Sequence, residues 1–375
     1  MKNTLNKVKI IIGGLILLSN VSVSFLQSQG RLSETEFILD KLVEKGIIEN
    51  YESQEIRNQI SNQYAEKIKK EKEEQDKKKK EDKFKIKTSG YLQIKYSIDE
   101  KTKAKDPLVI RRARVKFSRL LDKWIEFSMT PDFAGVTSGS NVSMKGVFVN
   151  IMPIESFSIK VGQDNQPFGF ENNYSSSKKK FDDAPYYMKN VLTDDYDYGV
   201  FLTYKQKLYS ATVSALNGTT KATEDNIFKD ISAKATFNPM KNIETGISHY
   251  YRYSGTSTVV EGNHSAVYVK LEDKKPLPYF FVAEYVFGKD SKIKHDCYNL
   301  IATAEVTLLN LLAPTVRYEI WDPDTSKSDN EITVYTVGVN IYPNKYTRFL
   351  VDYRIKQETP SVKDDKINFM VQVSF

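Results

Sequence analysis

The chain has 375 residues, of which 40% are hydrophobic, 12% are aromatic and 27% are charged, and its formal net charge is +7. It is too polar for a bundle of membrane helices, too aromatic for a disordered protein, and too weakly charged to imply a nucleic-acid partner. The single cysteine, Cys297, excludes an internal disulfide framework and a cysteine-rich zinc site. This composition suits a β-barrel, whose strands are apolar on one face only, and we expect no cofactor.

The first 24 residues have the pattern of a secretory signal peptide. Residues 1–9 are basic, residues 10–18 are an apolar run, and Ser22-Val23-Ser24 offers small residues for cleavage. The apolar run is shorter than the roughly 20 residues of a spanning helix, and no cysteine follows it as a lipoprotein anchor. The sequence therefore predicts export, with 1–24 removed.

Residues 25–83 predict a periplasmic helical and charged segment. Apolar residues between Phe37 and Ile60 recur at three- and four-residue spacing with a break at Gly46, which predicts two short helices. Residues 66–83 are almost all Lys, Glu, Gln and Asp, which predicts a solvated helix or a flexible linker. A short trimeric coiled coil is an alternative for this segment. So is an envelope tether or adhesin that uses the barrel as its anchor.

An alternation of side chains with period two begins at residue 84 and continues to the end of the chain. It predicts sixteen strands, near residues 84–97, 108–119, 123–132, 144–152, 155–163, 196–205, 207–216, 228–238, 242–253, 263–272, 277–288, 295–308, 314–321, 331–342, 345–357 and 366–375. Short links alternate with longer polar links, as in bacterial outer-membrane barrels. We therefore predict an all-β fold, a transmembrane antiparallel β-barrel over 84–375. Fourteen strands is the alternative if 144–163 or 196–216 is misread.

Charged residues gather on one face of several predicted strands. A lysine or arginine that faces lipid at mid-membrane costs about 2–4 kcal/mol, so these faces must line water. The cations predicted to line the lumen are Lys95, Arg112, Arg114, Lys116, Lys160, Lys234, Lys270, Arg317, Arg348, Arg354 and Lys356, against the acids Glu126, Asp132, Glu284, Glu305, Glu319 and Asp352. This excess of cations favours a weakly anion-selective pore, and a nonselective wall is the alternative.

One predicted link is much longer than the others. Residues 164–195 contain Pro167-Phe168-Gly169 near the start and a serine- and lysine-rich stretch in the middle. A loop of this length either lies outside the barrel or folds into the lumen as a constriction, and the sequence leaves both open.

The last ten residues predict the closing strand. Ile367, Phe369, Val371, Val373 and Phe375 share one face of residues 366–375. A terminal aromatic on an alternating strand resembles the carboxy-terminal signature of outer-membrane β-barrels. We expect this strand to pair with residues 85–97, Phe375 to serve in assembly, and outer-membrane lipid and the barrel assembly machinery to be partners.

A family resemblance rests on short motifs in a fixed order. They are Arg111-Arg112-Ala113-Arg114, Asp132-Phe133, Gly162-Gln163, Pro167-Phe168-Gly169 and Asp197-Tyr198-Gly199, and with them the chain resembles the phosphate-selective porin O and P family. The resemblance implies a homotrimeric porin of the bacterial outer membrane whose third loop folds inward. It also implies an arginine ladder, to which Arg112, Arg114 and Lys116 would belong, and anion binding by the loop residues Lys178, Lys179 and Lys180. The chain departs from the family at Phe181-Asp182-Asp183-Ala184, where the family tends to have Phe-Met-Glu-Arg. Phosphate or another small anion is the expected solute.

An enzymatic function is not expected. The three histidines, His249, His264 and His295, supply no triad-like constellation with a nucleophile, and no glycine-rich phosphate loop or metal cluster stands out.

Overall fold

The computed structural model describes residues 36–83, 85–100, 108–192, 195–218, 229–254, 260–274, 276–290, 296–309, 311–362 and 364–375. The predicted signal peptide (1–24) and His295 lie outside these residues. The chain divides into two compact units, Met1–Lys83 and Phe84–Phe375.

The described part of the first unit is a helical hairpin. Residues 36–44 form one helix, Gly46 turns the chain with a φ of +66°, and α3 (Asn50–Lys83) follows. Leu39, Ile48 and Ile56 form a small core between them. The prediction of two short helices was wrong for the second, because α3 continues through the Lys/Glu stretch. Lysine and glutamate are strong helix formers, and opposite charges four residues apart add support. Among the described residues no helix has the length and apolar composition needed to cross a membrane.

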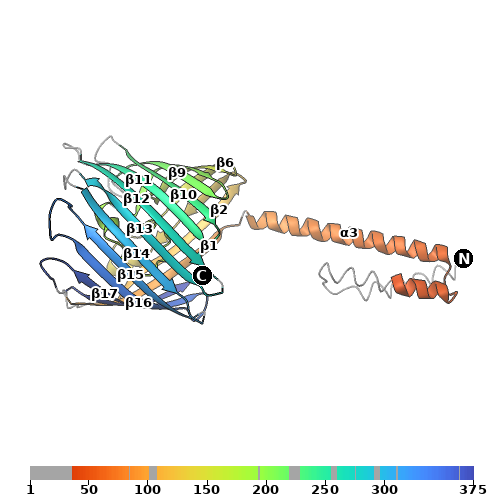
Figure 1. The fold of residues 1–375 in the computed structure, drawn as a ribbon. Helices are drawn as coiled ribbons and strands as arrows, with labels where there is room; N and C mark the ends of the chain where they lie inside the picture. Colours follow the sequence, from red (N-terminus) through yellow and green to blue (C-terminus); the bar gives the residue numbers. More distant parts are fainter. Residues whose placement is uncertain are drawn as a thin grey trace. The chain divides into compact units, whose positions relative to one another are not determined.

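The second unit is built of antiparallel strands (Figure 1). Their bounds are β1 (Lys87–Asp99), β2 (Leu108–Asp122), β3 (Ile125–Met129), β4 (Pro131–Asp132), β5 (Ser143–Met144), β6 (Val147–Ile154), β7 (Phe157–Asn165), β8 (Tyr196–Lys205), β9 (Tyr209–Leu216), β10 (Asp230–Met240), β11 (Ile243–Ser254), β12 (Val260–Asp273), β13 (Tyr279–Asp290), β14 (Asp296–Val306), β15 (Leu312–Asp322), β16 (Ile332–Ile341), β17 (Thr347–Gln357) and β18 (Lys366–Ser374). A short 3₁₀ helix, η1 (Ala134–Ser138), follows β4.

These eighteen described segments form sixteen spans and close into a barrel. β3 and β4 are two parts of one span because β2 pairs with both, and β5 and β6 are likewise the two parts of the next span. β1 pairs with β18 from Tyr91 opposite Ser374 to Asp99 opposite Lys366, which leaves no sheet edge open. The prediction of sixteen strands and of closure by the last strand is confirmed.

The two faces of the strands differ as the alternation predicts. In β1, Leu92 and Ile94 point outward and are exposed, whereas Gln93 and Lys95 point inward and are buried. The outward face is apolar because it meets lipid, and the inward face is polar because it meets water and other polar groups.

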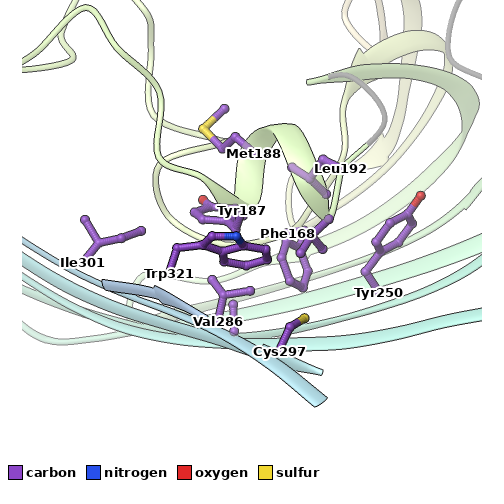
Figure 2. Packing of buried hydrophobic residues seen from close by; sticks show 11 residues of the cluster. Phe168, Tyr187, Met188, Leu192, Tyr250, Val286, Cys297, Ile301 and Trp321 are labelled. Carbon is purple, nitrogen blue, oxygen red and sulfur yellow. The ribbon is translucent and has the colours of Figure 1, made fainter. Parts of the chain in front are cut away.

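The core of the barrel lies inside the lumen. The segment between β7 and β8, which we call the lumen loop (residues 166–192 and 195), includes the short helix α4 (Tyr187–Asn190). Figure 2 shows its residues Phe168 and Tyr187 packed on wall residues such as Val286 and Trp321. The sequence left open whether this loop lies outside the barrel or inside it, and the structure places it in the lumen.

Candidate functional site

The lumen loop is attached to the wall through its backbone. Glu284 on β13 accepts hydrogen bonds from the N–H groups of Phe170 at 2.5 Å and Glu171 at 3.3 Å. Glu319 on β15 accepts one from Tyr186 N–H at 2.6 Å. Buried backbone groups need such partners, so wall acids at these positions hold the loop inside the barrel.

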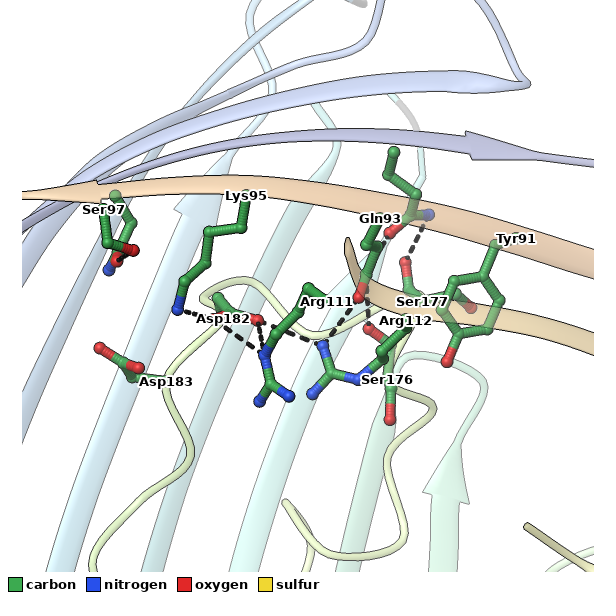
Figure 3. A network of polar contacts seen from close by, with 12 residues as sticks. Tyr91, Gln93, Lys95, Ser97, Arg111, Arg112, Ser176, Ser177, Asp182 and Asp183 are labelled. Atoms are coloured by element: carbon green, nitrogen blue, oxygen red, sulfur yellow. Dashed lines mark hydrogen bonds and ion pairs between the residues drawn. The ribbon is translucent and has the colours of Figure 1, made fainter. Parts of the chain in front are cut away.

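Asp182 of the lumen loop is the centre of an ionic cluster. Its carboxylate lies 2.6 Å from Lys95 Nζ, 3.0 Å from Arg111 Nε and 3.2 Å from Arg112 Nη1. Figure 3 shows these three side chains reaching from β1 and β2 towards the loop. Burial of Asp182 opposes its ionisation, but the charges of Arg111, Lys95 and Arg112 outweigh it and hold its pKa well below the usual range.

A β-bulge brings two consecutive arginines to the same carboxylate. The register of β1 with β2 shifts between Gln93 opposite Arg112 and Ile94 opposite Ile110, so Arg111 has no partner residue on β1. A bulge re-aims side chains in this way. Strict alternation predicts that Arg111 faces lipid, and sequence reasoning therefore missed it as a lumen residue. The signal in the sequence was the pair Arg111-Arg112. Strict alternation would place one of these two arginines in lipid at a high cost in free energy, so the alternation had to break there.

The arginines predicted to form a ladder are neutralised by acids. Arg112 pairs with Asp182, and Arg114 Nε lies 2.7 Å from Asp132 on β4. Arg114 also donates through Nη1 to the hydroxyls of Tyr91 at 3.1 Å and Ser176 at 3.3 Å. Both arginines therefore join loop and wall, and neither presents an unpaired charge to the lumen.

The three loop lysines have different surroundings. Lys178 is exposed, Lys179 is buried with its Nζ 3.6 Å from the sulfur of Met188, and Lys180 pairs with Glu305 at 2.6 Å. Only the first of the three presents its charge to open space.

The remaining predicted lumen cations also divide into paired and unpaired groups. Lys160 pairs with Asp164, and Arg354 donates to the hydroxyl of Tyr186 at 3.2 Å. Lys116 is exposed and lines a cavity. Arg348 is only 4% exposed and forms no ion pair with any described residue, although its Nη1 donates to the carbonyl of Ser177 at 3.4 Å.

Two cavities adjoin the tip of the lumen loop. The first, of about 460 Å³, lies between the loop and the β1–β8 part of the wall, and its charged lining is Arg114, Lys116, Lys145, Asp164 and Asp195. The second, of about 700 Å³, has as its charged lining Lys178, Lys180, Lys274, Lys345, Arg348, Glu272, Asp273 and Glu305. Tyr174 and Ser177 line both cavities, so they meet at the loop tip.

Unpaired positive charge faces the second cavity. Glu305 is occupied by Lys180, Thr315 and Asn340, and Glu272 lies 3.4 Å from Lys270. Lys178 and Arg348 have no such partner among the described residues. No group of three or more His, Cys, Asp or Glu side chains in the described part of the chain is placed to hold a metal ion.

Comparisons with known proteins agree with this architecture. The model of the family "phosphate-selective porin O and P" matches residues 86–270. Among solved structures, the anion-selective porin from Comamonas acidovorans is 10% identical with a TM-score of 0.58, covering 78% of this chain and 99% of that one. OmpT of Vibrio cholerae in its trimer form is 11% identical with a TM-score of 0.57 (78% and 99% covered). OmpF of Salmonella typhi in complex with daunomycin is 14% identical with a TM-score of 0.59 (79% and 99% covered). At these identities the structures show the fold alone. None of the curated proteins matches the chain significantly.

Proposed function

The chain is an outer-membrane channel of the phosphate-selective porin O and P family, and we propose that it is a passive diffusion pore for small hydrophilic solutes that prefers small anions. The family match and the closed barrel support the general conclusion that the protein is a channel in the bacterial outer membrane. The unpaired cations at the loop tip support the anion preference.

The observation that carries the preference is the pair Lys178 and Arg348. Both line the second cavity, and neither has a carboxylate within ion-pair distance among the described residues. Two unit charges 4 Å apart attract by about 4 kcal/mol at an effective dielectric constant near 20. Salt screens this attraction over about 8–10 Å at physiological strength, so the preference for anions weakens as salt rises.

Small anions in general are better supported than phosphate alone. The resemblance assigned Arg112 and Arg114 to an anion-binding ladder, but in this chain Asp182 and Asp132 occupy them. The carboxylate of Asp182 sits where a passing anion would meet the cations of β1 and β2. The cations left for solute include Lys116, Lys178 and Arg348, which have no ion-pair partner among the described residues.

The test is a reversal potential across a planar bilayer in a KCl gradient. Wild type is compared with the double variant Lys178→Gln/Arg348→Gln and with the control Lys67→Gln/Lys69→Gln, which removes two exposed charges from α3. We expect an anion-favouring potential in wild type and control and a shift towards zero in the double variant. A cation-favouring potential in wild type would sink the proposal.

We further propose a homotrimer in which residues 1–24 direct export, 25–83 lie in the periplasm and 84–375 form the pore. One of the similar structures is described as a trimer form, which supports the assembly. Cross-linking of the protein in outer-membrane vesicles tests it, and a product that stops at the dimer argues against it.

A tether is the second candidate function. The observation that favours it is α3, a helix of 34 residues that has no apolar face beyond Ile60 and so suits a solvated spacer. Deletion of 36–83 separates the two functions. A pore keeps its conductance without this segment, whereas a tether loses its attachment to the cell envelope.

A further inference from the structure

The short turns of the barrel are joined into one continuous edge. Each turn bonds through its backbone to the neighbouring span, so the turns follow one another around the barrel. The N–H groups of Met152, Lys205, Asn238, Glu272, Thr307, Tyr342 and Ser374 donate in turn to the carbonyls of Trp124, Ser156, Leu208, Asn242, Pro278, Leu311 and Tyr346. We call this edge the short-turn rim.

Exposed lysines recur along the short-turn rim. Five of the seven short turns in the described part of the chain carry at least one. They are Lys123, Lys205, Lys207, Lys241, Lys274 and Lys345. None of them forms an ion pair with another described residue, and the acids of the same turns are fewer, namely Asp122, Glu155 and Asp273. The rim is therefore positively charged.

Each lysine-bearing turn also exposes a large apolar side chain. These are Trp124, Leu208, Met240, Leu277 and Tyr346, which are between 41% and 62% exposed. They continue the lipid-facing apolar surface of the strands to its end. An apolar side chain beside an exposed lysine suits the boundary where acyl chains give way to headgroups, because a lysine stem lies along apolar surface while its ammonium stays in the polar layer.

Two of the longer links, on the opposite edge of the barrel, differ from the short turns in charge. The links 323–331 and 358–365 contain six acids (Asp324, Asp329, Glu331, Glu358, Asp364 and Asp365) and only two lysines, Lys327 and Lys363. In these two links acids outnumber lysines, whereas in the short turns lysines outnumber acids. In outer-membrane barrels the short turns lie on the periplasmic side.

We propose that the short-turn rim binds anionic phospholipid headgroups. The lysines attract the lipid phosphate through charge, and the neighbouring apolar side chains contact the first acyl carbons. A free solute anion would interact with the lysines alone, because it has no apolar part that could contact the outward-facing apolar side chains. This inference differs from the anion preference of the pore, which rests on Lys178 and Arg348, although the rim residues Lys274 and Lys345 also line the second cavity.

The experiment uses the full-length protein in a neutral detergent with equal amounts of phosphatidylglycerol and phosphatidylcholine of matched chains. Bound lipids are counted by native mass spectrometry. Wild type is compared with a rim variant that changes Lys123, Lys207, Lys241, Lys274 and Lys345 to Gln. The matched control changes five exposed lysines of α3, Lys67, Lys69, Lys70, Lys72 and Lys77, to Gln.

We expect wild type and control to retain phosphatidylglycerol preferentially. The rim variant should lose that preference by at least about fivefold, the effect of a single lysine near an anionic surface, and Lys→Arg changes at the same five positions should restore it. Equal retention of the two lipids by wild type overturns the proposal, as does a control that loses as much as the rim variant. Heat-shifted gel mobility reports folding, and single variants Lys207→Gln and Lys241→Gln replace the rim variant if it does not fold. Because Lys274 and Lys345 also line the second cavity, the pore is reported separately by the reversal potentials of the single variants Lys207→Gln and Lys241→Gln, whose lysines do not line it.

Discussion

Phe375, the last residue of the chain, exchanges two backbone hydrogen bonds with Gly90 of the partner strand β1, with N–O distances of 3.0 and 3.1 Å. Its ring also covers Gly90, because a Cβ placed there would lie 2.6 Å from the ring carbon Cζ. An aromatic ring over a glycine on a facing strand fills the space that the glycine leaves. The terminal aromatic therefore closes the barrel through its backbone and its side chain together.

Deletion of Phe375 should lower the yield of folded barrel, because it removes two closing hydrogen bonds and uncovers Gly90. The measurement is membrane yield with heat-shifted gel mobility. Phe369→Ala is the matched control, since Phe369 lies on the same face of β18 and its loss leaves the terminal bonds in place. Equal yields of the deletion, the control and wild type would contradict this role.

Asp182→Asn should loosen the lumen loop. The change leaves Lys95, Arg111 and Arg112 without their carboxylate, and breaking a buried ion pair costs about 3 kcal/mol or more. We expect a free-energy cost at the low end of the range for buried ion pairs, because the Arg111 side chain is 39% exposed. Single-channel recordings should show larger open-channel noise and a stronger preference for chloride. Asp40→Asn, which removes an exposed ion pair with Arg57 in the helical hairpin, is the control and should change neither quantity much.

The pH dependence of the loop follows from the lowered pKa of Asp182. A depressed folded pKa gives stability that is complete above the ordinary aspartate value of 3.8 and is lost as pH falls through the lower folded value. Channel noise of wild type should therefore stay constant from pH 7 down to about 4 and rise only in stronger acid. Asp182→Asn should be noisy throughout that range. A rise in wild-type noise between pH 6 and 5 would show that Asp182 does not set the pH dependence of the loop.

The three loop lysines should differ in their effect on selectivity. Lys178→Gln removes an exposed charge at the second cavity and should lower the chloride preference. Lys179→Met removes a buried ammonium whose described partner is a thioether, and it should leave both selectivity and folding unchanged or improve folding. Reversal potentials of the two variants provide the comparison. If both variants shift the reversal potential equally, the lysine charges act at long range and not through their exposure to the cavity.

Phosphate should not be singled out among multivalent anions. Because Asp182 occupies the cations of β1 and β2, we expect inorganic phosphate and sulfate to reduce the chloride current to a similar extent. Recordings with each anion on wild type and on the variant with Lys178, Lys179 and Lys180 all changed to Gln measure this. A block by phosphate alone that disappears in the triple variant would restore the specificity that the family name implies.

The sequence by itself determined the barrel. The direction of a side chain from a strand is a local property with a period of two, so the residues themselves divide into lipid-facing and lumen-facing sets. The same alternation predicted sixteen spans and the closing pair β1–β18, and it placed Arg112, Arg114 and Arg348 on the inward face. The structure of charged segments such as residues 66–83 was harder to predict, because a helix without an apolar face leaves little periodic signal in the sequence.

Only the tertiary structure decided which lumen charges are free. Asp182 meets Lys95 across 87 positions of sequence, and Lys180 meets Glu305 across 125. No local pattern records such pairs, since they depend on the inward path of the lumen loop and on the bulge at Arg111. The alternation could therefore identify a basic lumen, whereas the folded chain pairs most of that charge internally and leaves Lys178 and Arg348, which line the second cavity, without an ion-pair partner among the described residues.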